Sequence, residues 1–141
     1  TYCFNIVGMS PELLNQLLDM EIGKHLFPKG KKARMTPVFP CLTLPGQASF
    51  ATGTYPGTHG IVANGFYDRK RYEVSFWDQY RSLVQATPIW EKIKQNDPSA
   101  KTAVLFCQNT LYGNADIIIT PKPMHTDDGL VQWCYSKPVN F

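Results

Sequence analysis

The apolar runs of this 141-residue sequence are short, and segments with helical periodicity separate them. The runs at 102–106 and 117–119 have the length of single strands, far below the roughly 20 apolar residues of a membrane-spanning helix. The spacing of Leu13, Leu14, Leu17 and Leu18 predicts a helix over 10–20 that begins at Ser10. Strand and helix patterns that alternate in this way predict an α/β fold with a largely parallel sheet.

With the helix at 10–20 included, the main elements follow along the chain in the order strand, helix, loop, helix, strand, strand. We expect a buried strand at 2–7, a helix opening after Pro45, a turn-rich stretch at 53–65, a strand at 72–77, a helix beginning at Thr87-Pro88, and strands at 101–106 and 116–120. After Pro121 the sequence is loop-like. These elements are too few to close a large sheet, so we expect a fragment of a longer α/β protein.

Composition excludes several classes of protein. The chain is 43% hydrophobic and 18% charged, as in a folded globular protein. Its net charge is +3, and the basic run at 29–34 is expected to be a solvated loop. That run lacks interleaved aromatic residues, so we expect no nucleic-acid partner, and the short apolar runs predict no membrane partner.

Cysteine usage and the first residues bear on the compartment. The four cysteines form no C-x-x-C pair, which argues against a zinc knuckle or a thioredoxin-type site. No signal-peptide pattern opens the chain. We therefore expect a cytoplasmic protein with reduced thiols.

The most specific segment lies at 36–68. Thr43 is followed by Leu-Pro-Gly, and the run from Thr52 to Asp68 has the form TG-x-YP-x-x-HGI-x-x-N-x-x-YD. This segment resembles the signature of the type I phosphodiesterase/nucleotide pyrophosphatase family, within the alkaline phosphatase superfamily. The segments at 76–91 and 116–129 are similar to a microbial branch of that family.

The resemblance implies a fold and an activity. The fold would be the three-layer α/β/α fold of alkaline phosphatase, with residues 1–141 forming the N-terminal portion of one catalytic domain. The activity would be metal-dependent hydrolysis of a phosphodiester or pyrophosphate bond in a small, nucleotide-like substrate. The cofactor would be zinc, as two divalent ions, and the reaction would pass through a phospho-threonine intermediate.

The resemblance also assigns roles to residues. Thr43 would be the nucleophile and a zinc ligand, and Asn64, which lies 21 residues later, would donate to a phosphoryl oxygen. A threonine hydroxyl needs activation to attack phosphorus, and a neutral amide donor suits a diester, which carries one negative charge. His59 would be structural and not a metal ligand. From the residues alone, Thr43 could simply cap a helix, and Asn64 before Gly65 could simply form a turn.

Two departures from the family pattern matter. Val7 occupies the position where the family has a metal-binding aspartate. No D-x-x-x-H or D-H pair occurs in the sequence, so this chain by itself is expected to have little or no activity.

The alternative function is a catalytically inactive module of the same fold that binds a phosphate ligand or a partner. A third possibility is a different chemistry of the same superfamily, such as phosphomonoester hydrolysis or phosphoryl-group transfer. Asn64 argues against a monoesterase, because a cationic clamp would suit its dianionic substrate better. The sequence does not define an oligomeric state.

Overall fold

A computed structural model describes residues 1–138. The chain forms two compact units, Thr1–Met35 and Thr36–Phe141. Helices and two small sheets make up the described residues, so the α/β class predicted from the sequence is confirmed. The largely parallel sheet that was predicted is not found in these residues, because one strand pairing is parallel and the other two are antiparallel hairpins.

The first unit contains two short helices, α1 (Pro11–Asp19) and α2 (Glu21–Leu26). The predicted helix after Ser10 is confirmed, with the Ser10 hydroxyl accepting a hydrogen bond from the backbone N–H of Leu13 at 3.2 Å. Gly23 lets the two helices approach closely, since a Cβ at this position would lie 1.9 Å from the carbonyl oxygen of Leu17.

The predicted buried strand at 2–7 is wrong. These residues form no strand and lie exposed, with Tyr2 92% and Val7 83% accessible. An extended segment becomes a strand only when another strand satisfies its backbone N–H and C=O groups. The described residues of the first unit contain no second strand.

The second unit opens with the helices that carry the 36–68 segment. Helix α3 (Thr43–Thr52) begins at Thr43, before the predicted opening after Pro45, because proline is tolerated in a first helical turn. It ends at Gly53, whose φ of 69° is left-handed. The short helix α4 (Pro56–His59) follows within the turn-rich stretch. Farther along lie the 3₁₀ helix η1 (Arg81–Leu83) and α5 (Ile89–Asn96), which confirms the predicted helix, although Pro88 and not Thr87 occupies its N-cap.

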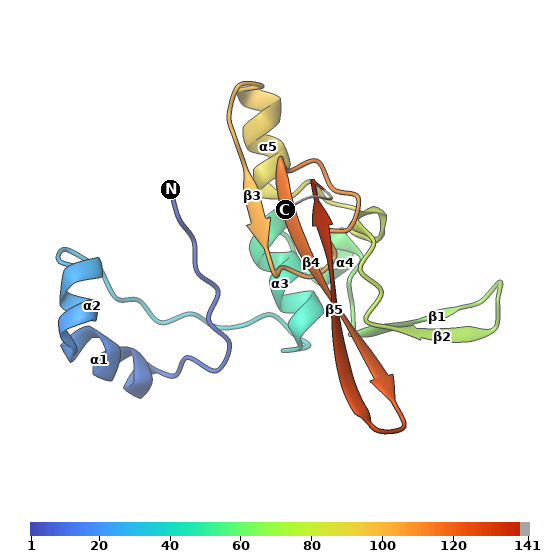
Figure 1. The fold of residues 1–141 in the computed structure, drawn as a ribbon, viewed down its shortest axis with the longest axis horizontal. Helices are drawn as coiled ribbons and strands as arrows, with labels where there is room; N and C mark the ends of the chain where they lie inside the picture. The colour runs from blue at the N-terminus through green and yellow to red at the C-terminus, as the bar shows by residue number, and fades with distance from the viewer. Residues whose placement is uncertain (139–141) are drawn as a thin grey trace. The chain divides into compact units, whose positions relative to one another are not determined.

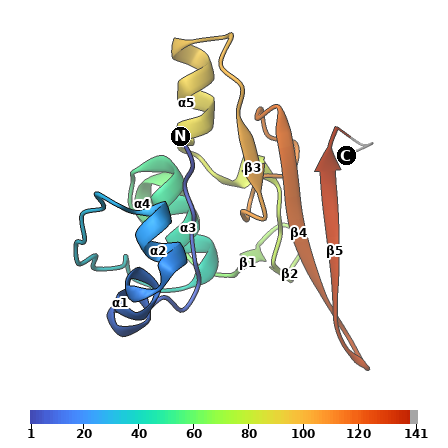
Figure 2. The ribbon, with the colours of Figure 1, turned by 60° about the vertical axis from the view of Figure 1, so that its left-hand side comes forward.

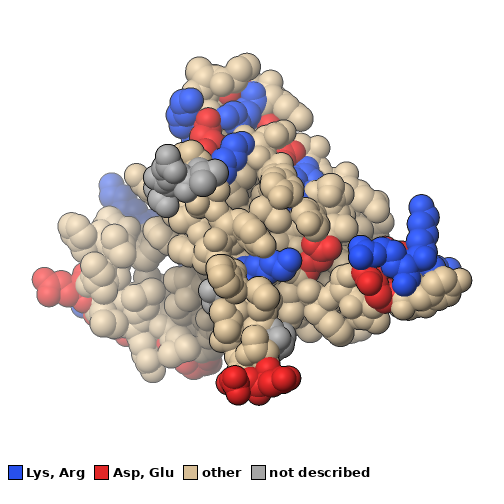
Figure 3. Space-filling view, turned by 45° about the vertical axis from the view of Figure 1, so that its right-hand side comes forward, with Lys and Arg blue, Asp and Glu red and all other residues tan. Residues whose placement is uncertain are grey.

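Strands β1 (Gly65–Asp68) and β2 (Glu73–Phe76) form an antiparallel hairpin, which confirms the strand predicted at 72–77. Figure 1 shows this hairpin reaching away from the rest of the second unit. Acidic and basic groups lie together at its outer end (Figure 3), where Arg71 and Glu73 form an ion pair at 3.1 Å. Both partners are largely exposed, so this pair contributes little to stability.

The second sheet contains β3 (Ala103–Leu105), β4 (Ile117–Thr126) and β5 (Gly129–Lys137), side by side in that order (Figure 2). The predicted strands at 101–106 and 116–120 are confirmed, but the loop predicted after Pro121 is wrong. The backbone carbonyl of Ile119 points to the β3 side of β4, where it accepts from the N–H of Phe106, the residue after β3. In a strand, the nitrogen and the carbonyl of one residue point to the same side, and every second residue repeats this direction. The backbone nitrogens of Pro121 and Pro123 therefore point to the same side as the Ile119 carbonyl, away from β5, and neither proline interrupts the β4–β5 ladder.

Two small apolar clusters lie in the second unit. Leu44, Ala48, Ile61 and Val84 form the first, and Val104, Ala115 and Ile118 form the second. A half-buried ion pair fixes η1 to α5, with Arg81 Nε donating to a carboxylate oxygen of Glu91 at 2.8 Å. In the part of the chain that the structure describes, no helix is long and apolar enough to cross a membrane.

Candidate active site

Thr43 occupies the first position of α3 and is exposed. The N-cap is Leu42, which makes no side-chain cap hydrogen bond, so Thr43 does not cap this helix. Its neighbour Leu44 is fully buried in the first apolar cluster and fixes the first turn in place. The hydroxyl of Thr43 thus lies at a helix N-terminus, where backbone N–H groups and the helix dipole favour an anion.

Asn64 lies beside this turn. Its side-chain oxygen accepts a hydrogen bond from the backbone N–H of Leu44 at 3.0 Å, across a separation of 20 residues. A backbone N–H can only donate, so the contact fixes the amide orientation and leaves the NH₂ of Asn64 available to donate to another group. The structure therefore brings the two predicted site residues, Thr43 and Asn64, to the same turn of α3.

His59 is buried and holds α4 against α3. Its Nδ1 accepts from the backbone N–H of Ile61 at 3.1 Å, and its Nε2 lies 2.8 Å from the hydroxyl of Ser49. Since the N–H of Ile61 can only donate, the ring is neutral and carries its proton on Nε2. Burial lowers the pKa of His59, which agrees with a neutral ring. Both nitrogens have partners within the protein.

The sequence did not single out Gln47, which also lies close to this turn. It follows Thr43 by one helical turn, and its side-chain oxygen accepts from the backbone N–H of Gln108 at 2.8 Å. The helical spacing from Thr43 was the only available signal. The partner of Gln47 lies 61 residues away, a separation that no local pattern connects.

The sequence profile of the family described as type I phosphodiesterase / nucleotide pyrophosphatase matches residues 1–138. The chain belongs to this family. The mixed α/β structure is consistent with the alkaline phosphatase-like fold of the family.

Individual relatives of this family member match shorter segments. Ectonucleotide pyrophosphatase/phosphodiesterase family member 1 of Rattus norvegicus is 41% identical over 58 residues, which are 41% of this chain and 6% of the relative. An uncharacterized pyrophosphatase/phosphodiesterase of Schizosaccharomyces pombe is 31% identical over 75 residues, 45% of this chain and 14% of the relative. An ectonucleotide pyrophosphatase/phosphodiesterase of Caenorhabditis elegans is 26% identical over 121 residues, 77% and 14% respectively. The matches thus span only a small part of each relative's length.

The described residues of this family member do not form a metal centre. Among them, no group of three or more His, Cys, Asp or Glu side chains could hold a metal ion. Val7, at the position where an aspartate was expected, has no ligating atom and lies in the first unit. Cys3, Cys41 and Cys134 are exposed, and the reduced state of the cysteines stays a prediction.

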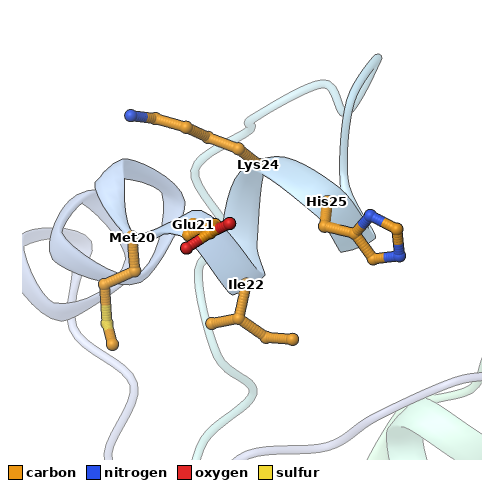
Figure 4. A pocket seen from close by; sticks show the side chains of 5 residues that line it. All are labelled: Met20, Glu21, Ile22, Lys24 and His25. Atoms are coloured by element: carbon orange, nitrogen blue, oxygen red, sulfur yellow. The ribbon is translucent and has the colours of Figure 1, made fainter.

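A hollow of about 750 Å³ in the first unit is lined by Met20, Glu21, Ile22, Lys24 and His25. Figure 4 shows the Lys24 and His25 side chains pointing away from each other and not converging on a common point. A ligand site needs a few convergent polar groups, which this hollow lacks. It contains neither Thr43 nor Asn64.

Proposed function

We propose that the whole protein hydrolyses phosphodiester or pyrophosphate bonds of a small, nucleotide-like substrate, with Thr43 as nucleophile and Asn64 as phosphoryl-oxygen donor. The hydrogen bond from Leu44 N–H to Asn64 carries this proposal. It ties an amide donor to the turn that bears the exposed Thr43 hydroxyl, although the two residues are far apart in sequence. Membership of the family supports a hydrolase of this class.

The reaction would proceed in two displacements at phosphorus. The Thr43 oxygen attacks phosphorus and loses its proton to solvent, while the bond to the leaving oxygen breaks and that oxygen takes up a proton. Water then attacks the phospho-threonine, the bond between phosphorus and the Thr43 oxygen breaks, and the hydroxyl is restored. The NH₂ of Asn64 donates to a non-bridging oxygen, where charge increases in each transition state.

Zinc dependence belongs to the same proposal, with the Thr43 hydroxyl as one ligand. Among the described residues, no three His, Cys, Asp or Glu side chains come together to form a zinc site. We therefore assign no chemical step to a metal ion, and the remaining ligands would have to come from outside the described residues.

The test is hydrolysis of a chromogenic phosphodiester and of its monoester counterpart by the whole protein, first stripped of metal and then supplied with zinc. We expect zinc-dependent cleavage of the diester that Thr43→Ala abolishes. Cleavage that is independent of zinc would contradict the metal part alone. No cleavage of either substrate would favour the alternative, an inactive module that binds a phosphate ligand, and binding of a non-hydrolysable diester would then be measured.

A further inference from the structure

Hydrogen bonds close into a ring that begins and ends on α3. The ring starts at the backbone N–H of Leu44 and returns to the helix at the side chain of Gln47. We call this set the hydrogen-bonded ring, and its members are Leu44, Asn64, Trp77, Gln79, Gln108 and Gln47. It links α3 to the start of β1, to the segment after β2 and to the loop after β3.

The first half of the ring runs through Asn64. The side-chain oxygen of Asn64 accepts from Leu44, and its backbone carbonyl accepts from the N–H of Trp77 at 2.9 Å. The carbonyl of Trp77 then accepts from the side-chain NH₂ of Gln79 at 3.1 Å. Both the side chain and the backbone of Asn64 are therefore fixed by the ring.

The second half returns to the helix through two glutamines. The NH₂ of Gln79 also donates to the side-chain oxygen of Gln108. The backbone N–H of Gln108 donates to Gln47, which lies on the same side of α3 as Thr43 because it follows by one turn. The ring therefore holds α3 at two points, next to Thr43 and one turn beyond it.

Burial and backbone strain both indicate that the hydrogen-bonded ring holds Gln79 and Trp77 in one fixed conformation. Gln79 is 1% exposed, and its side-chain oxygen accepts from the N–H of Asn109 at 2.9 Å, so every polar group of its amide is used. Trp77 has a φ of 55°, which a bulky residue rarely adopts. Such a conformation persists only where surrounding contacts enforce it, and the ring uses both the N–H and the C=O of Trp77.

We propose that the hydrogen-bonded ring positions Asn64 against Thr43, with Gln47 and Gln79 as positioning residues. The inference rests on the proposed function of Thr43 and Asn64. Neither glutamine is required to touch the substrate. Gln79 holds the carbonyl of Trp77, whose N–H donates to Asn64, and Gln47 holds Gln108, which in turn accepts from Gln79. Loss of one link therefore lets the Asn64 amide move away from the place where the phosphoryl oxygen lies. Small displacements of this kind reduce turnover strongly, since transition-state donors act over a narrow range of distance.

Gln47→Met tests the ring, because methionine has a similar length but cannot accept the hydrogen bond from Gln108. In the whole protein we expect kcat for a chromogenic diester to fall about 10-fold, with KM within about 2-fold of wild type. Gln47→Glu keeps the acceptor and should restore kcat to within about 3-fold. Gln95→Met, the same substitution at an exposed position of α5, is the matched control and should not change kcat.

A double-mutant cycle separates positioning from a general loss of structure. If Gln47 acts through Asn64, then adding Gln47→Met to Asn64→Ala should lower kcat by less than about 2-fold further. Independent, multiplicative losses would overturn the proposal, and so would a Gln47→Glu variant no better than Gln47→Met. If the wild-type protein cleaves no diester, the proposed function fails. Hydrogen exchange of the Trp77 amide in Gln47→Met then decides the ring alone, since unchanged exchange overturns it.

Discussion

Helices α1 and α3 satisfy their first turns in opposite ways. Helix α1 is capped locally, by the hydroxyl of Ser10 accepting from Leu13 three residues later. Helix α3 has the apolar Leu42 at its N-cap, and the acceptor for its first turn comes from Asn64, 20 residues away. A local cap helps form a helix before the rest of the protein folds. A remote cap forms only when the chain has folded, and the Thr43 hydroxyl at the helix start then has no capping role.

The largest effect is expected at the start of α3. Thr43→Ala should lower turnover by the whole protein at least about 10³-fold, because the attacking oxygen is lost. The melting temperature should stay close to wild type, since Thr43 caps nothing. Diester hydrolysis and thermal unfolding measure the two quantities. Near-normal turnover would remove Thr43 as the nucleophile, and a large loss of stability would show that it supports the helix after all.

Two variants of Asn64 separate its two proposed contributions. Asn64→Ala removes both the acceptor for Leu44 and the donor for the phosphoryl oxygen. It should cost on the order of 100-fold in kcat and about 1 kcal/mol in the free energy of unfolding. Asn64→Asp keeps the acceptor, so stability should be retained while kcat still falls. Urea unfolding and steady-state kinetics test this, and an aspartate variant with normal kcat would contradict the donor role.

The local cap of α1 offers the contrasting case. Ser10→Ala should destabilise α1 by about 1 kcal/mol, the ordinary value for a lost cap, without changing kcat. Amide exchange within α1 reports the first quantity and diester hydrolysis the second. Reduced kcat in this variant would show that α1 matters to the site, which the remote cap of α3 gives no reason to expect.

The smallest expected effect is a loss of α1 stability at low pH. The hydrogen bond with Ser10 and the backbone N–H of Glu12 lower the pKa of the Glu12 carboxyl below its usual 4.5. A lowered pKa means that the ionised form stabilises α1 above about pH 4.5, and that this contribution is lost as the pH falls through the folded-state pKa. Protection factors in α1 should therefore drop in acid, while the neutral Asn64 cap of α3 does not titrate. Glu12→Gln should remove the pH dependence from α1, and its persistence in that variant would assign it to another group.

The contrast between the local cap of α1 and the remote cap of α3 also explains which parts of the fold could be predicted from the sequence. Ser10, Pro11 and Glu12 lie together, so local rules place the start of α1 within one residue. The start of α3 was placed too late, because its cap is not local. The prolines at 121 and 123 suggested a loop, since a sequence does not reveal which way a backbone nitrogen faces. The strand predicted at 2–7 was wrong because apolar composition supplies no pairing partner.

Some residues of the candidate site could be predicted from the sequence, and others could not. Thr43 and Asn64 were identified from a motif, and the structure brings them together. Gln47, Gln79 and Gln108 were not identified, because their contacts join positions 29 and 61 residues apart. Glutamine is common on protein surfaces, so its type alone gives no signal.

The hydrogen bond between Asn64 and Leu44 also bears on chemical ageing. Asparagine is a thermolabile residue because its side-chain amide can deamidate. The reaction begins when the backbone nitrogen of the following residue, here Gly65, attacks the side-chain amide carbon, and a glycine hinders this attack least. That attack requires the side chain to rotate, yet its oxygen is held by Leu44, and Gly65 is paired with Phe76 in the hairpin. We therefore expect the contact that orients the proposed donor also to slow its deamidation to an aspartate, which could no longer donate.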